Sequence, residues 1–185
     1  MFGKNIVISQ YIEPSGSLKI VDLFYTIQGE GPYNGMPSVF VRLAGCNLRC
    51  SWCDTDFETG AKVRELGNLI ELIQVAANHR TKLVVITGGE PLLQNIVPLI
   101  KELTRRQYRV QIETAGTIWV PLLEECDITL VCSPKTGKVN KEILNRCKHF
   151  KYVVGMGDTV TEEGHIVTAT QPGAKPMALA RPKDG

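Results

Sequence analysis

Short apolar stretches rich in β-branched residues recur along the chain, and each has the length of one β-strand. The first stretch is interrupted by charged residues, whereas the stretch at 82–87 is compact and rich in valine and isoleucine. Glycine or proline follows several of them closely, as expected where a strand ends. The pattern predicts strands over residues 18–27, 38–43, 82–87, 108–113, 127–132 and 150–154.

Two segments between these strands carry apolar residues at the spacing of a helix that is buried on one face. The first set is Leu66, Leu69, Ile70, Ile73, Ala76 and Ala77, and the second is Leu92, Ile96, Leu99, Ile100 and Leu103. Pro91 suits the first position of the second helix, because its missing N–H would have no partner there. Pro98 lies inside the same pattern and is expected to kink or shorten that helix. A third, short helix is predicted over residues 140–147.

The alternation of strands and helices predicts right-handed crossovers and a parallel sheet, and therefore an α/β fold. Ligands of such sheets bind beyond the carboxyl ends of the strands. Four unusual sequences follow predicted strands and would meet at that edge. They are the cysteine-containing loop at 45–53, Gly-Gly-Glu-Pro at 88–91, Glu-Thr-Ala-Gly at 113–116 and Ser-Pro-Lys at 133–135.

The composition is that of a single globular domain, residues 1–185, with 43% apolar and 22% charged residues. A formal net charge of +2 is too small to indicate a nucleic-acid or membrane surface. No apolar run is long enough to cross a membrane and no signal-peptide pattern is visible, so a cytoplasmic location is expected. Residues 155–185 have little apolar patterning and are expected to be weakly structured.

Three of the six cysteines, Cys46, Cys50 and Cys53, fall within eight residues. In a reducing compartment this C-x3-C-x2-C loop is expected to bind metal rather than form disulfides. Three thiolates can hold three corners of a cubic iron–sulfur cluster and leave the fourth iron open to a small molecule. A zinc site is the main alternative, and simple burial of the thiols is a third interpretation. The fourth zinc ligand would be one of Cys126, Cys132 and His149; Cys126, Cys132 and Cys147 are otherwise expected in the core.

The cysteine loop and the Gly-Gly-Glu-Pro turn together resemble the radical S-adenosylmethionine (SAM) superfamily, in which three cysteines hold a [4Fe–4S] cluster. Further motifs make the chain similar to the 7-carboxy-7-deazaguanine synthase family. These are Thr-Ile-Gln-Gly-Glu-Gly at 26–31, Phe-Val-Arg-Leu-Ala-Gly-Cys-Asn-Leu at 40–48, Cys-Asp-Thr-Asp-Phe at 53–57, Thr87, Glu-Thr at 113–114 and Ser-Pro-Lys at 133–135. The resemblance covers residues 22 to about 154 and implies a partial, open (β/α) barrel with a mostly parallel sheet.

The resemblance also implies roles for individual residues. The cluster would be held by Cys46, Cys50 and Cys53, and Mg²⁺ by Thr55. SAM would contact Trp52, Cys53, Asp54, Gly89, Ser133, Pro134 and Lys135. The substrate would contact Ile27, Gln28, Gly29, Arg42 and Thr87. Arg42 is the candidate for a carboxylate, because a guanidinium fork matches a carboxylate with two hydrogen bonds. Glu90 is expected to cap its helix, and Glu113 to be either a cofactor contact or a solvated acid.

The implied reaction converts 6-carboxy-5,6,7,8-tetrahydropterin into 7-carboxy-7-deazaguanine with loss of ammonia, in the queuosine pathway. A reduced cluster would cleave SAM, and the resulting 5′-deoxyadenosyl radical would remove a hydrogen atom from the pterin. A flavodoxin or ferredoxin is the expected electron donor, and a homodimer is the expected assembly. Two other functions stay open: a radical SAM enzyme that activates a protein, and a non-enzymatic iron–sulfur or zinc module.

The end of the chain departs from the family pattern. Family members continue with a Gln-Pro-Met-Asp-like strand, a helix and a final strand, whereas Gln171-Pro172 is here followed by Gly173-Ala174. The C-terminal part of the family fold is therefore expected to be absent. Cofactor binding by this chain is expected to be weaker than in a longer form.

Overall fold

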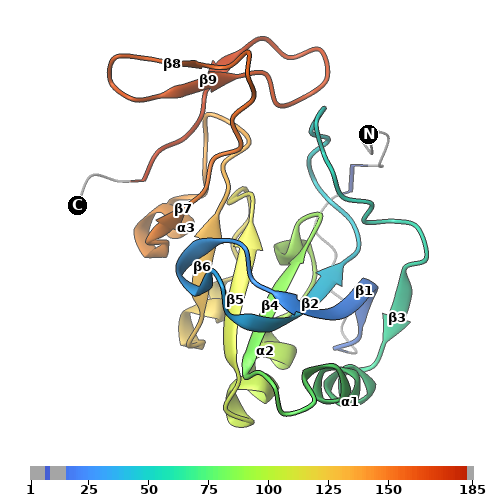
Figure 1. Ribbon diagram of the computed structural model, residues 1–185. Helices are drawn as coiled ribbons and strands as arrows, with labels where there is room; N and C mark the ends of the chain where they lie inside the picture. Colours follow the sequence, from blue (N-terminus) through green and yellow to red (C-terminus); the bar gives the residue numbers. More distant parts are fainter. Residues whose placement is uncertain (1–6, 9–15, 183–185) are drawn as a thin grey trace.

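The computed structural model describes residues 7–8 and 16–182, which contain one large sheet, helices packed on it and a small second sheet (Figure 1). The strands of the large sheet lie in the order β3-β1-β2-β4-β5-β6-β7. Their bounds are β1 (Leu18–Ile27), β2 (Pro37–Leu43), β3 (Lys62–Arg64), β4 (Leu83–Gly88), β5 (Arg109–Thr114), β6 (Thr129–Cys132) and β7 (His149–Phe150). The series from β2 to β7 is parallel, whereas β1 and β3 add an antiparallel edge. The α/β class and the mostly parallel sheet are as predicted from the strand–helix alternation.

The two longer helices pack on this sheet and form the core with it. α1 (Leu66–Ala77) contacts β1 and β2, and α2 (Val97–Arg105) contacts β5. Buried apolar side chains such as those of α1 each contribute roughly 1.5–3 kcal/mol to stability. The residues that α1 buries are Leu69, Ile70, Ile73 and Ala77, all part of the helical pattern. The shorter elements are α3 (Lys141–Arg146) and the 3₁₀ turns η1 (Gly31–Tyr33), η2 (Pro91–Leu93) and η3 (Pro121–Glu125).

The helix predicted over residues 92–103 is divided into η2 and α2, with a break at Gln94. Gln94 leaves the helical path because its side chain is bound elsewhere. Its Nε2 donates to the carbonyls of Lys19 and Ala44, both at 3.0 Å, and its Oε1 accepts from the Lys19 N–H at 2.8 Å. Pro98 consequently lies in the first turn of α2, where proline is tolerated. The shorter helix expected from Pro98 is observed, since α2 begins only at Val97.

The last strand of the large sheet is shorter than predicted. Pairing was expected over residues 150–154, but β7 contains only His149 and Phe150. Its neighbour β6 ends at Cys132, and the Lys151 N–H makes a bond to the Cys132 carbonyl at 2.8 Å. Because β6 stops there, the chain beyond Lys151 leaves the sheet.

Residues 155–185 were expected to be weakly structured; residues 183–185 lie outside the described part of the chain, and residues 155–182 contain three short strands. They are β8 (Thr159–Val160), β9 (Ile166–Thr168) and β10 (Met177–Ala178), and they pair antiparallel in the order β10-β9-β8. This small sheet projects beyond one end of the large sheet (Figure 1). Strands of two or three residues are too short to produce a recognisable alternation of apolar and polar positions, which is why the sequence did not predict them. Within the described ranges, every helix is too short or too polar to span a lipid bilayer.

The connection between β1 and β2 crosses over the large sheet. It passes in front of β5 and β6 before returning into β2 (Figure 1). On this path Gly31 has a φ of 69°, and a Cβ there would lie 2.7 Å from Cγ2 of Val131 on β6. Farther across, Glu30 Oε2 and Lys151 Nζ form an ion pair at 2.6 Å. The crossing therefore links β1, near one edge of the sheet, to the segment after β7 at the other edge.

Candidate functional site

A cavity of about 410 Å³ lies at the carboxyl ends of the parallel strands. Most of the residues proposed from the sequence line it. They are Gln28, Gly29, Arg42, Cys46, Cys50, Trp52, Cys53, Asp54, Thr55, Thr87, Gly89, Ser133 and Lys135. Ile27 and Pro134 are not wall residues, because Ile27 is 63% exposed at the end of β1 and Pro134 is buried behind its turn. The fold thus gathers the proposed residues into one cavity, while the ligand that each contacts stays a prediction.

The three clustered cysteines lie on the loop that leaves β2. Gly45 begins this loop with a left-handed φ of 87°, and its N–H donates to the Phe57 carbonyl at 3.1 Å. Burial raises the pKa of the Cys46 thiol to about 12, and burial also raises the pKa of the Cys50 thiol. Such thiols keep their protons at neutral pH until a metal replaces the proton. Cys46 and Cys50 are therefore weak nucleophiles as long as they keep their protons.

The proposed metal ligands differ in where the fold places them. Within the described residues, no three His, Cys, Asp or Glu side chains are grouped closely enough to hold one metal ion. The three loop cysteines line the same cavity, which is the placement that a shared cluster requires. The proposed fourth zinc ligands Cys126, Cys132 and His149 are not among the described wall residues. Cys132 and Cys147 are buried in the core, and Cys126 packs against it.

Gly88 and Gly89 lie where β4 meets the cysteine loop. Gly88 has a φ of 146°, a conformation that other residues rarely adopt. A Cβ on Gly89 would lie 2.2 Å from the Gly45 carbonyl oxygen and 2.7 Å from Cβ of Cys46. The N–H of the next residue, Glu90, donates to the same Gly45 carbonyl at 2.9 Å. Glycine is therefore required at positions 88 and 89, which we call the glycine strip, so that this segment can lie against the cysteine loop.

Glu90 caps η2 as expected, but its larger role is to join the ends of β4 and β5. Its carboxylate is fully buried and accepts the Leu92 N–H at 3.1 Å. It also accepts from Thr114 Oγ1 at 2.8 Å and from the Ala115 N–H at 2.8 Å. Burial raises the pKa of this carboxyl, while the hydrogen bonds and the charge of Lys135 oppose that shift. The glycine strip is thus tied to the Glu-Thr-Ala-Gly turn through one buried side chain.

Glu90→Gln should destabilise the protein by roughly 1–3 kcal/mol, because the NH₂ group of the amide would face either the Leu92 N–H or the Ala115 N–H, where Glu90 presents an oxygen to each. The folded-state pKa of Glu90 lies above its ordinary value of 4.5. Its favourable contribution is therefore fully present below about pH 4.5 and is lost as the pH rises through the folded-state pKa. Urea unfolding of both proteins between pH 4.5 and 8 should show a wild-type advantage that shrinks with rising pH. An advantage that grows with pH would contradict the raised pKa.

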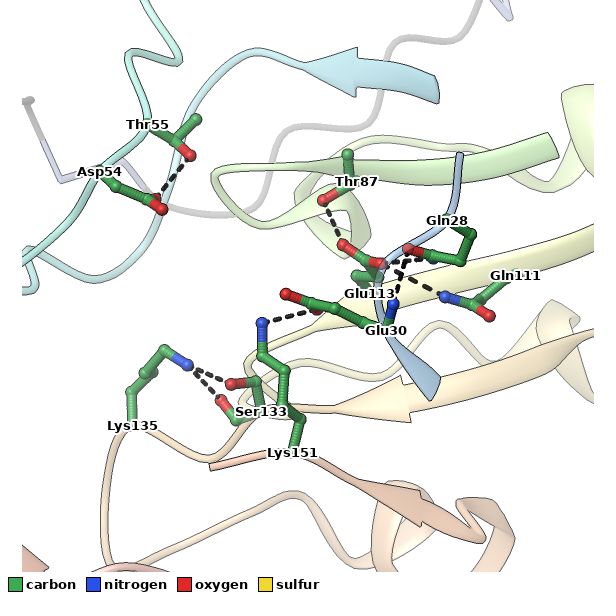
Figure 2. Close-up of polar contacts among 10 residues, drawn as sticks. All are labelled: Gln28, Glu30, Asp54, Thr55, Thr87, Gln111, Glu113, Ser133, Lys135 and Lys151. Atoms are coloured by element: carbon green, nitrogen blue, oxygen red, sulfur yellow. Dashed lines mark hydrogen bonds and ion pairs between the residues drawn. The ribbon is translucent and has the colours of Figure 1, made fainter. Parts of the chain in front are cut away.

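The Ser-Pro-Lys turn after β6 faces the cysteine loop from the other side. Lys135 Nζ donates to the Ser133 carbonyl at 3.1 Å and to Ser133 Oγ (Figure 2). The same ammonium lies 5.1 Å from the centre of the Trp52 ring. Burial lowers the pKa of Lys135. A cationic, hydrogen-bonding group is thereby held beside the cysteines, where it can meet an anionic part of a bound cofactor.

Arg42 on β2 lies beside the oxygen-bearing side chains of Asp54 and Thr55, which directly follow the cysteine loop. Its Nη1 donates to Thr55 Oγ1 at 2.9 Å, and Thr55 Oγ1 donates to Asp54 Oδ1 at 3.0 Å (Figure 2 shows the second bond). The guanidinium also lies 5.9 Å from the centre of the Phe24 ring. Adjacent hydroxyl and carboxylate oxygens are the hard donors that Mg²⁺ prefers.

Glu113, at the carboxyl end of β5, is the centre of a hydrogen-bond network on the cavity wall. Gln28 Nε2 donates to its Oε1 at 2.9 Å, and Gln111 Nε2 donates to the same oxygen at 3.2 Å (Figure 2). Thr87 Oγ1 donates to its Oε2 at 3.1 Å. Glu113 thus joins two residues proposed for substrate, Gln28 and Thr87, rather than those proposed for the cofactor. The Glu-Thr motif pointed to Glu113, whereas nothing in the sequence pointed to Gln111.

Two further residues reach the site from parts of the chain without motifs. Lys151 lines the cavity and is paired with Glu30 of the Gln-Gly-Glu-Gly sequence (Figure 2). Gln171, to which no motif assigns a role, contacts Cys50. A lysine after a strand and a glutamine in a polar segment carry no signal of their own, so only the fold could reveal them.

The chain is similar to radical SAM proteins in sequence and in structure. The profile of the Radical SAM superfamily matches residues 40–170. A 7-carboxy-7-deazaguanine synthase of Rhodospirillum rubrum is 45% identical over 185 residues, which is 100% of this chain and 79% of that protein. The protein of that name from Rickettsia prowazekii is 38% identical over 164 residues, 83% of this chain and 69% of that protein. The crystal structure of QueE from Escherichia coli has a TM-score of 0.65 and 29% identity, over 75% of this chain and 72% of that one.

These similarities agree with the topology. The structural match covers the open, mostly parallel sheet, and the superfamily match runs from β2 through the cysteine loop to the segment after β9. The fold implied by the motifs is therefore confirmed.

Proposed function

We propose a reaction for this chain from the premise that it belongs to the 7-carboxy-7-deazaguanine synthase family of the radical SAM superfamily. The reaction is conversion of 6-carboxy-5,6,7,8-tetrahydropterin into 7-carboxy-7-deazaguanine, with release of ammonia. One observation carries the proposal: a single cavity joins the three clustered thiols to a polar pocket that contains Arg42 and Glu113. A zinc or electron-transfer module has no need of that pocket, and an enzyme acting on a protein backbone has no need of two opposite charges in it.

Membership of the superfamily implies a [4Fe–4S] cluster and SAM. Bound together, they supply a 5′-deoxyadenosyl radical, which can remove a hydrogen atom from an unactivated carbon. We assign the cluster to Cys46, Cys50 and Cys53, whose thiols share the cavity wall. For SAM we assign residues of the Gly-Gly-Glu-Pro turn, the Ser-Pro-Lys turn and the cysteine loop with the adjacent Asp54. They are Trp52, Cys53, Asp54, Gly89, Ser133 and Lys135, with Pro134 shaping its turn from behind.

The pocket beside the thiols suits a molecule with a carboxylate at one end and N–H donors at the other. Arg42 can bind the carboxylate through two parallel hydrogen bonds. Glu113 can accept from the ring N–H and the amino group of the pterin, and its oxygens are already oriented by Gln28 and Thr87. Gly29 presents backbone groups on the same wall, and Ile27, whose side chain is exposed, would contribute backbone groups alone.

Arg42→Ala should raise the KM for the pterin roughly 10- to 150-fold, because a hydrogen-bonded charged group contributes about 1.5–3 kcal/mol to binding. Iron and sulfide content should be unchanged, since the hydrogen bond of Arg42 goes to Thr55 rather than to a cysteine. Arg42→Lys, which keeps the charge but loses the fork, should give an intermediate KM. Loss of iron from Arg42→Ala would make the residue structural and contradict its assignment to substrate.

We assign Mg²⁺ to Thr55, with the Asp54 carboxylate adjacent to it. Magnesium keeps several waters and substrate oxygens in its shell, so a site with one or two protein oxygens fits an ion that binds together with substrate. Because Arg42 Nη1 also donates to Thr55 Oγ1, the ion and the substrate carboxylate would be neighbours. A flavodoxin or ferredoxin as electron donor and a homodimeric assembly are further parts of the proposal that rest on the family resemblance.

The proposal is tested by anaerobic purification and reconstitution, followed by dithionite, SAM and the carboxytetrahydropterin. We expect 5′-deoxyadenosine and the deazaguanine product, and neither from Cys50→Ala. A fully loaded cluster that yields no 5′-deoxyadenosine would overturn the reaction class. Formation of 5′-deoxyadenosine without the deazaguanine would keep the class and overturn the substrate.

A further inference from the structure

The segment that follows β9 lies on the cysteine loop. The Ser51 N–H donates to the Thr170 carbonyl at 2.9 Å, and the Arg49 N–H donates to Gln171 Oε1 at 2.8 Å. Thr170 Oγ1 also donates to the Lys135 carbonyl. Positions 49 and 171 are 122 residues apart in sequence, so these contacts are made by the tertiary fold alone. Residues 170–171 thus form part of the support of the loop.

The side-chain amide of Gln171 has a defined orientation. Its Oε1 accepts the Arg49 N–H, and an amide nitrogen could not replace the oxygen in that bond. Nε2 must therefore occupy the other position, where it lies 3.3 Å from Cys50 Sγ and 3.3 Å from Thr170 Oγ1. The amide consequently directs an N–H donor at the sulfur of one of the three cysteines.

We propose that Gln171 is a positioning residue for the cluster, which acts through Cys50 and raises the reduction potential of the cluster. The inference rests on the proposed function, because it requires a cluster held by the three loop cysteines. A hydrogen bond to a ligand sulfur withdraws negative charge from it. The reduced cluster carries one more negative charge than the oxidised cluster, so the donor stabilises the reduced form more and makes it easier to reach.

The donor end of Gln171 is separable from the attachment of the loop. The bond between the Ser51 N–H and the Thr170 carbonyl joins two main-chain groups and does not involve the Gln171 side chain. The bond from the Arg49 N–H uses Oε1, not Nε2. Variants can therefore remove the donor to sulfur and the acceptor for Arg49 in different combinations.

The test is a redox titration of the reconstituted proteins, with the reduced cluster followed by electron paramagnetic resonance. Gln171→Met has a similar length and lacks both the donor and the acceptor, whereas Gln171→Lys lacks the acceptor but keeps N–H donors. Gln171→Glu keeps the acceptor for the Arg49 N–H and lacks the donor. Pro172→Ala, at the exposed neighbouring position, is the matched control. We expect a lower midpoint potential for the Met and Glu variants, a potential at or above wild type for the Lys variant, and no change in the control.

Each other outcome overturns a specific statement. An unchanged potential in Gln171→Met and Gln171→Glu overturns the inference and leaves the proposed function intact. Equal decreases in Gln171→Met and Gln171→Lys also overturn it, because the lost bond to Arg49 would then set the potential. Wild-type protein that takes up no cluster overturns the proposed function and the inference together.

Discussion

Replacing Gly89 by alanine should abolish cluster incorporation and lower the free energy of unfolding by about 3 kcal/mol or more. The added Cβ would lie 2.2 Å from the Gly45 carbonyl oxygen, a backbone atom that cannot move aside as the end of a flexible side chain can. The glycine strip must therefore separate from the cysteine loop and break the 2.9 Å bond from the Glu90 N–H to that carbonyl. Denaturant unfolding of the metal-free protein and iron analysis after reconstitution measure the two effects.

Gly67→Ala in α1 is the matched control for this substitution. A Cβ on Gly67 would meet nothing within 4 Å, and its φ is not in the left-handed region. Alanine should leave iron content unchanged and make the helix more stable by up to about 1 kcal/mol. Normal iron content in Gly89→Ala would contradict the requirement for a close approach between the strip and the loop.

Replacing Glu113 by alanine should lower kcat/KM for the pterin roughly 10²- to 10⁴-fold. Two hydrogen bonds from the substrate to a charged acceptor would be lost, at about 1.5–3 kcal/mol each. In addition, the donors of Gln28, Gln111 and Thr87 would lose their common acceptor and no longer define the pocket. Steady-state kinetics with the reconstituted enzyme give the ratio, and SAM binding measured without pterin should stay near the wild-type value.

Glu113→Gln is the isosteric control for that experiment. It retains one acceptor oxygen and presents an NH₂ group where a second acceptor is needed, so its kcat/KM should fall between those of wild type and Glu113→Ala. A selective loss of SAM affinity in either variant would make Glu113 a cofactor contact, the alternative that the sequence left open.

The strands that the sequence predicted well are those with a continuous apolar run and a glycine or proline after it. β4 is of this kind, and its interior is buried at the centre of the sheet. β3 and the strands of the small sheet contain two or three residues each, and their pairing depends on neighbours distant in sequence. The break at Gln94 was not predicted for the same reason, because it is caused by bonds to Lys19 and Ala44 across the fold.

The candidate site was largely predictable because parallel strands bring their carboxyl ends to one edge. Arg42, Gly89 and the cysteines all lie on or just after such ends, so a correct topology was sufficient to gather them. Gln111 and Gln171 reach the site by other routes: one is a polar residue buried inside β5, and the other arrives on a segment whose fold has no sequence signature. Their contributions follow from side-chain packing, which a residue pattern does not encode.

The ion pair between Glu30 and Lys151 has a consequence for the order in which this enzyme matures. Its partners are 121 positions apart, and such non-local contacts carry a large loop-closure entropy and form slowly. A nascent polypeptide leaving the ribosome has its cysteines long before it has Lys151, so the thiols emerge before the enclosure that will shelter them. The part of the cavity wall that Glu30 and Lys151 complete together therefore cannot form until the chain beyond β7 has been synthesised.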